Sequence, residues 1–105
     1  MSVQKKLDEL NKDIELLKKN NYKMQSKIDT NKEIIEAHNE QIFELMLDEN
    51  NVVDDIEKII RTNRIIMIHD IIHVFENENS QLNKYIKIRN KIIKKYQNKV
   101  INLVF

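Results

Sequence analysis

The sequence of 105 residues contains no glycine, proline, cysteine or tryptophan. Glycine and proline supply most tight turns and hairpin loops, so their joint absence argues against a turn-rich β fold. It also excludes the glycine-rich loops that bind phosphate groups. The lack of cysteine excludes disulfides and thiolate chemistry. These absences leave long helices as the expected structure.

Part of this composition reflects coding bias. The chain has 18 Ile, 15 Lys and 14 Asn but one Ala and three Arg, a pattern typical of an AT-rich genome. The same bias depletes glycine and proline. The prediction of helices therefore depends mainly on hydrophobic periodicity.

The balance of charged and apolar residues indicates a small, ordered unit, since 33% of the residues are charged and 41% are hydrophobic. The longest apolar stretch, Ile65 to Phe75, is far shorter than the ~20 residues of a membrane-spanning helix and contains charge. Met1 to Glu9 is charged, and no apolar segment of a signal peptide follows. We expect an intracellular, soluble and cytoplasmic protein without a signal peptide or transmembrane segment.

A heptad pattern dominates the first half of the chain. From Val3 the apolar residues recur at alternating steps of four and three, which predicts a helix over about 3–47 with one stripe facing a partner helix. Asn21, Asn31 and His38 interrupt this stripe. At ~1.5 Å per residue the helix is about 65–70 Å long and needs an equally long partner. The predicted oligomer seam comprises Leu7, Leu10, Ile14, Leu17, Met24, Ile28, Ile35, Ile42 and Leu45.

Polar residues then predict a turn over about 48–52, because the heptad pattern stops there and two asparagines favour turn conformations. Asn51, Asp54 or Asp55 is suited to cap a second helix over about 53–103. A break at about 77–80, with Ser80 as a cap, would give three helices. The single unit 1–105 is thus predicted to be all-α, either an elongated coiled coil or a helical hairpin of two long helices.

The second helix carries two apolar patterns. Ile56, Ile59 and Ile66 continue the first register, whereas a second register, offset by two, begins near Ile65. The apolar arc between Ile65 and Phe75 covers about half of the helix circumference, which suits contact with two or more neighbours. We therefore expect an oligomeric bundle, with a second apolar face at Ile65, Ile68, Ile72 and Phe75.

The net charge of +1 conceals a gradient along the chain. The net charge is −1 over residues 1–47, −5 over 48–79 and +7 over 80–105. The last segment forms a basic amphipathic helix with an exposed face of Lys84, Lys87, Lys91, Lys94 and Lys95. We interpret it first as a core-facing helix with solvated lysines, and alternatively as a contact to nucleic acid phosphates or to an anionic membrane surface.

Only one cluster resembles a metal site. His69 and His73 share a helix face with Glu76, and two histidines at i and i+4 can chelate an ion. No further histidine follows them, and a polar stripe opposite the core is the simpler interpretation. We expect no metal, no cofactor, no catalytic residue and no small-molecule substrate.

The sequence thus predicts a non-enzymatic structural, scaffold or adaptor protein. It would act through coiled-coil oligomerisation with a protein partner, most simply a second copy of itself. The alternative is binding to nucleic acid or an anionic membrane through the basic C-terminal helix.

Overall fold

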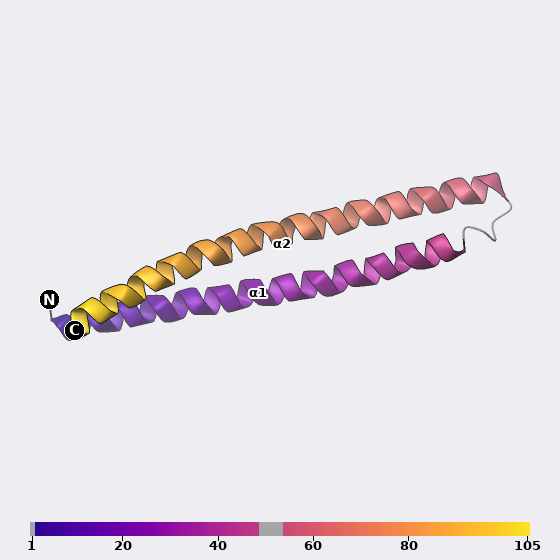
Figure 1. Cartoon of the computed structure of the whole chain (residues 1–105). Helices are drawn as coiled ribbons and strands as arrows, with labels where there is room; N and C mark the ends of the chain where they lie inside the picture. Colours follow the sequence, from indigo (N-terminus) through magenta and orange to yellow (C-terminus); the bar gives the residue numbers. More distant parts are fainter. Residues whose placement is uncertain (1, 49–53) are drawn as a thin grey trace. The chain divides into compact units, whose positions relative to one another are not determined.

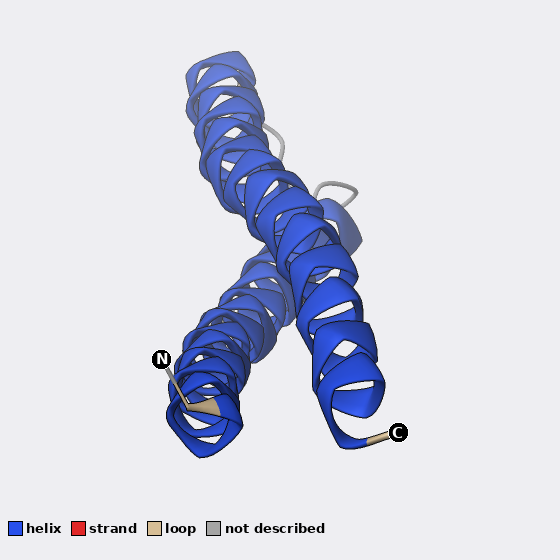
Figure 2. Ribbon diagram, turned by 90° about the vertical axis from the view of Figure 1, so that its left-hand side faces the viewer, coloured by secondary structure: helices blue, strands red, loops and turns tan. Residues whose placement is uncertain are grey.

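The computed structural model describes residues 2–48 and 54–105, which form two long helices, α1 (Val3–Leu47) and α2 (Asp55–Val104). Figure 1 shows the two helices, and Figure 2 shows no strand in the described ranges. The predicted all-α helical hairpin is confirmed. The predicted turn at about 48–52 lies, apart from Asp48, outside the described residues. Because α2 is continuous through residues 77–80, the three-helix alternative is wrong and Ser80 is not a cap.

Side-chain caps define where both helices begin. The Ser2 hydroxyl oxygen accepts a hydrogen bond from the Lys5 backbone amide at 3.2 Å. The Asp54 carboxylate accepts one from the Ile56 amide at 3.0 Å, so Asp54 is the one of the three proposed residues for which a cap is observed. Each cap satisfies an amide that has no partner inside the helix.

Backbone contacts divide the hairpin into two compact units. Unit 1 comprises residues 1–27 and 81–105, and unit 2 comprises residues 28–80. In unit 2, Asn31 contacts Asn79 and Asp48 contacts Arg61, so the two helical segments are antiparallel. In unit 1, contacts that join Met24 to Arg89 and Asn21 to Asn90 show the same arrangement.

The inward-facing residues of unit 2 follow heptad positions a and d on both helices. Ile28, Ile42 and Ile72 are at most 7% exposed, and they form the centre of the core. The less buried neighbours complete the same stripes. They are Ile35, His38 and Leu45 on α1, and Arg61, Ile65, Ile68 and Phe75 on α2.

Unit 1 repeats this pattern with Ile14 and Ile93 as its buried residues, each 7% exposed. Partly buried side chains extend the stripes toward both helix ends. They are Leu7, Leu10, Leu17, Asn21 and Met24 on α1, and Leu82, Ile86, Arg89, Tyr96, Val100 and Leu103 on α2. The predicted heptad pattern is therefore the core of the hairpin.

A buried asparagine pair sets the register in unit 2. The Asn31 amide donates to Asn79 Oδ1 at 2.8 Å and to Glu78 Oε1 at 3.0 Å, and Asn31 is fully buried. Asn79 in turn donates to the carbonyl oxygen of Ile28 at 3.4 Å. The Asn31 Oδ1 atom has no hydrogen-bond partner among the described residues. Such a pair contributes more to the choice of register than to net stability.

The core assignment predicts opposite results at two adjacent positions. Ile42→Asp places a carboxylate in the unit 2 core and should lower the free energy of unfolding by at least ~3 kcal/mol. Phe43→Asp is the matched control, because Phe43 is 62% exposed; its effect should stay within ~0.5 kcal/mol. Thermal denaturation followed by circular dichroism compares the two. Equal losses would contradict this core.

The asparagine pair predicts non-additive effects. Asn31→Ala removes the donor to Asn79 and Glu78 and should cost about 1–3 kcal/mol of stability. The double substitution Asn31→Leu and Asn79→Leu removes the buried amides together and should be neutral or stabilising. Urea denaturation of Asn31→Leu, Asn79→Leu and the double variant measures the coupling. A double variant less stable than either single variant would show that the pair stabilises the fold.

Candidate functional site

The predicted oligomer seam lies inside the hairpin. Its apolar residues on α1 are buried or partly buried toward α2 of the same chain, in either unit 1 or unit 2. The predicted second apolar face also points inward and packs against the α1 segment of unit 2. Its residues are Ile65, Ile68, Ile72 and Phe75. A partner molecule that binds this conformation must therefore use other residues.

The outer side of α2 in unit 2 is such a surface. It carries seven large apolar side chains that are 40–68% exposed. We call it the outer apolar surface; it comprises Ile56, Ile59, Ile60, Ile66, Met67, Ile71 and Val74. Within residues 2–48 and 54–105, no helix has the length and apolar character needed to cross a membrane.

The half-circumference apolar arc explains this surface. Its inner half, which includes Ile68 and Ile72, packs against α1, and its outer half has no covering element in the described chain. The sequence pattern revealed the width of the arc. It did not reveal which half the second helix of the same chain would leave exposed.

Acidic residues predominate among the charged residues of unit 2, and α1 also exposes Phe43, Met46 and Leu47 there. Counted over the sequence, unit 2 has thirteen acidic and four basic residues, a net charge of −9. Arg61 lies at a core position near the end of the unit, with its guanidinium 4.0 Å from Asp48 and 3.7 Å from Glu57. This partly buried arginine thus lies near one acid at the end of α1 and one acid on α2.

Unit 1 has the opposite charge. It has fourteen basic and four acidic residues, a net charge of +10, because pairing brings the lysine-rich start of α1 beside the acid-free end of α2. The predicted basic face is exposed at every position, namely Lys84, Lys87, Lys91, Lys94 and Lys95. The charge gradient of the sequence thus becomes one basic unit and one acidic unit.

Beside the basic face, α2 of unit 1 carries a short apolar row. Tyr85 is 52% exposed, Ile88 is 54% exposed and Ile92 is partly exposed. Their spacing of three and four residues places them on one side of the helix. This row is therefore a second exposed apolar strip, bordered by lysines.

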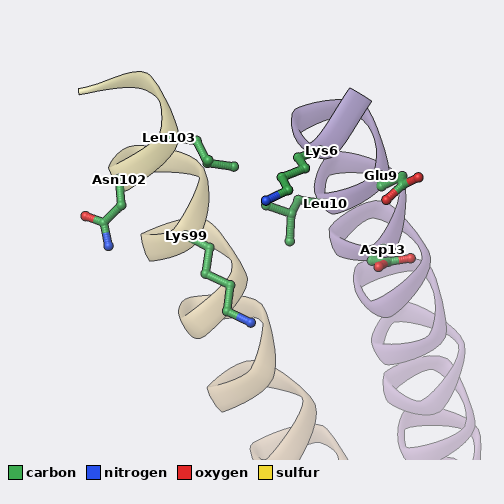
Figure 3. A pocket seen from close by; sticks show the side chains of 7 residues that line it. All are labelled: Lys6, Glu9, Leu10, Asp13, Lys99, Asn102 and Leu103. Atoms are coloured by element: carbon green, nitrogen blue, oxygen red, sulfur yellow. The ribbon is translucent and has the colours of Figure 1, made fainter. Parts of the chain in front are cut away.

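An open groove of about 440 Å³ lies between the helices of unit 1. Figure 3 shows Leu10 and Lys6 extending from α1 toward α2, and Leu103 and Lys99 extending from α2 toward α1. Lys99 also lies 5.4 Å from the centre of the Tyr96 ring, a cation–π distance. The groove is open to solvent, and its lysines add to the positive charge of unit 1.

The histidine cluster lies on the surface of α2. His73 Nδ1 is 3.8 Å from a Glu76 carboxylate oxygen, and these side chains are 69% and 53% exposed. His69 is also exposed. Among the described residues, no group of three or more His, Asp or Glu side chains is arranged to hold a metal ion.

Seam histidine His38 has a local partner. Its Nδ1 atom lies 2.7 Å from the Ile34 carbonyl oxygen, one helical turn before it. Because a carbonyl oxygen accepts hydrogen bonds, this contact assigns the proton to Nδ1. The Nδ1 atom of the partly buried His38 is thus satisfied by its own helix.

No family model matches the sequence, and no curated protein or solved structure is significantly similar to it. Two surfaces of the hairpin are therefore the candidates for function. One is the outer apolar surface of unit 2, and the other is the basic face of unit 1.

Proposed function

We propose that this protein is a non-enzymatic structural or adaptor subunit that acts by helix–helix association. The observation that carries the proposal is the outer apolar surface of unit 2. Seven large apolar side chains on one side of a single helix form a contiguous patch of the kind that marks protein–protein contacts.

The spacing of the patch favours a helix as the partner. Ile60, Met67 and Val74 recur at intervals of seven, and Ile71 fills the intermediate position four residues after Met67. A row that alternates in this way stays on one side of a helix and packs into the spaces of a facing helix. Full burial of an exposed side chain of this size contributes roughly 1.5–3 kcal/mol, and these side chains, which are 40–68% exposed, contribute a part of that each.

A paired substitution tests the proposal. Met67→Gln with Val74→Gln makes two side chains of the patch polar, each of which is 64% exposed, and should lower the mass of the assembled protein. The matched control is Phe43→Gln with Met46→Gln, in the same unit on α1, at 62% and 54% exposure. The control should leave the mass unchanged.

Light scattering at several concentrations measures both pairs, with circular dichroism to verify that helicity is retained. A wild-type chain that stays monomeric at every concentration would contradict self-assembly through this surface. Equal losses of mass in the two pairs would show that the patch is not the specific contact.

A second candidate function is electrostatic binding of nucleic acid by unit 1. It is favoured by the net charge of +10 and by five exposed lysines on one face of α2. Such a face contacts phosphates without reading bases, since arginine is scarce and no base-reading motif is present. The acidic unit 2 would repel the same polyanion, which is why this candidate is second.

Salt dependence separates this candidate from the first. If unit 1 binds RNA or DNA, affinity for an oligonucleotide should fall by about 10³-fold or more between 50 and 200 mM salt when about six phosphates are contacted. Changing Lys84, Lys87 and Lys91 to Gln should abolish most of the binding. Anionic vesicles serve as the membrane probe in the same titration. Absence of binding to either probe at low salt would eliminate the candidate.

A further inference from the structure

We infer that a second copy of this chain occupies the part of the outer apolar surface formed by Met67, Ile71 and Val74, with α2 of one copy antiparallel to α2 of the other. In this arrangement the segment 67–74 in unit 2 of one copy lies against the segment 85–92 in unit 1 of the second copy. The inference rests on the proposed function and adds the partner, the orientation and the register.

Charge complementarity selects the second copy. Unit 1 has a net charge of +10 and unit 2 a net charge of −9, so contact between unlike units of two copies attracts on both sides. Contact between like units would repel. A polyanion would complement unit 1 alone and leave the acidic unit unexplained, whereas a second copy accounts for both charges.

The exposed apolar residues of the two segments match in one register. Both rows occupy heptad positions c and g of α2, which lie outside the a and d positions of the hairpin core. In an antiparallel pair, a step forward along one helix is a step back along the other. Three apolar layers result, with Met67 facing Ile92, Ile71 facing Ile88, and Val74 facing Tyr85 of the second copy.

Two of the three positions that border these layers agree with the same register. Asp70 of one copy lies opposite Lys91 of the other, which attracts, and Ile56 lies opposite Phe105, which is 99% exposed in the single chain. Beyond Met67, Arg64 meets Lys95 of the second copy. Because these two cations repel, the run of consecutive apolar layers ends there, and this position weakens the dimer.

The contact is self-complementary. A two-fold axis repeats it, so that unit 1 of each copy meets unit 2 of the other and six apolar layers are buried. This isologous contact gives a closed dimer of two hairpins. An open chain of copies would instead grow with concentration.

A charge exchange tests the register on the full chain. Asp70→Lys replaces two attractive contacts with repulsive ones and should raise the dimer dissociation constant about tenfold, as should Lys91→Asp. The double variant Asp70→Lys with Lys91→Asp restores the attraction and should return the constant to within about threefold of wild type. Lys95→Glu places an anion opposite Arg64 of the second copy and should lower the dimer dissociation constant about threefold. Sedimentation equilibrium measures each constant.

The matched control is Glu76→Lys with Lys94→Asp, which exchanges two exposed charges that do not face each other in this register. It should show no restoration relative to its single variants. If the patch variant Met67→Gln with Val74→Gln dissociates the assembly but the Asp70 and Lys91 exchange does not restore it, the register is wrong and the proposed function stands.

If wild type is monomeric at every concentration, the second copy is ruled out together with self-assembly through the patch. Mass that grows without limit would exclude the closed dimer. Dissociation of the dimer by an added oligonucleotide, together with tight binding of that oligonucleotide, would indicate nucleic acid as the preferred occupant of unit 1.

Discussion

The contact between Asn31 and Asn79 constrains which surfaces this protein can offer to a partner. A slip of one heptad between the helices would place the fully buried Asn31 amide against Ile72, where it could not donate to an oxygen. The true register pairs amide with amide and aligns the isoleucine layers on either side. Once that register is set, the inner stripes of both helices are occupied and only the outer faces remain available.

Folding back concentrates charge as well as apolar surface. The acidic second half of α1 lies beside the acidic start of α2, which gives unit 2 its net charge of −9. Such crowding opposes a compact fold through self-repulsion, and Arg61, between Asp48 and Glu57, offsets only part of it. Pairing of the helices thus buries apolar side chains but brings like charges close together within each unit.

The sequence predicted both helices to within a few residues, because heptad repetition over many turns is a strong local signal. It predicted less about pairing. A row such as Ile28, Ile35 and Ile42 shows that a helix has a partner, but the same row serves a partner in the same chain or in another. The polar position Asn79 was not predicted as a core residue, since an asparagine is recognised as inward-facing only after its neighbours are placed. Exposure of Met67, Ile71 and Val74 depended on that same pairing.

The separation of contacts along the chain also differs between the two units. Asn31 and Asn79 are 48 residues apart, whereas Met24 and Arg89 are 65 apart and Asn21 and Asn90 are 69 apart. Since the entropy lost on closing a loop grows with its length, the contacts of unit 2 close at lower entropic cost. Unit 1 then closes on a shortened loop. Pairing that starts in the acidic unit and ends with the basic ends of the chain therefore has the lowest loop-closure cost.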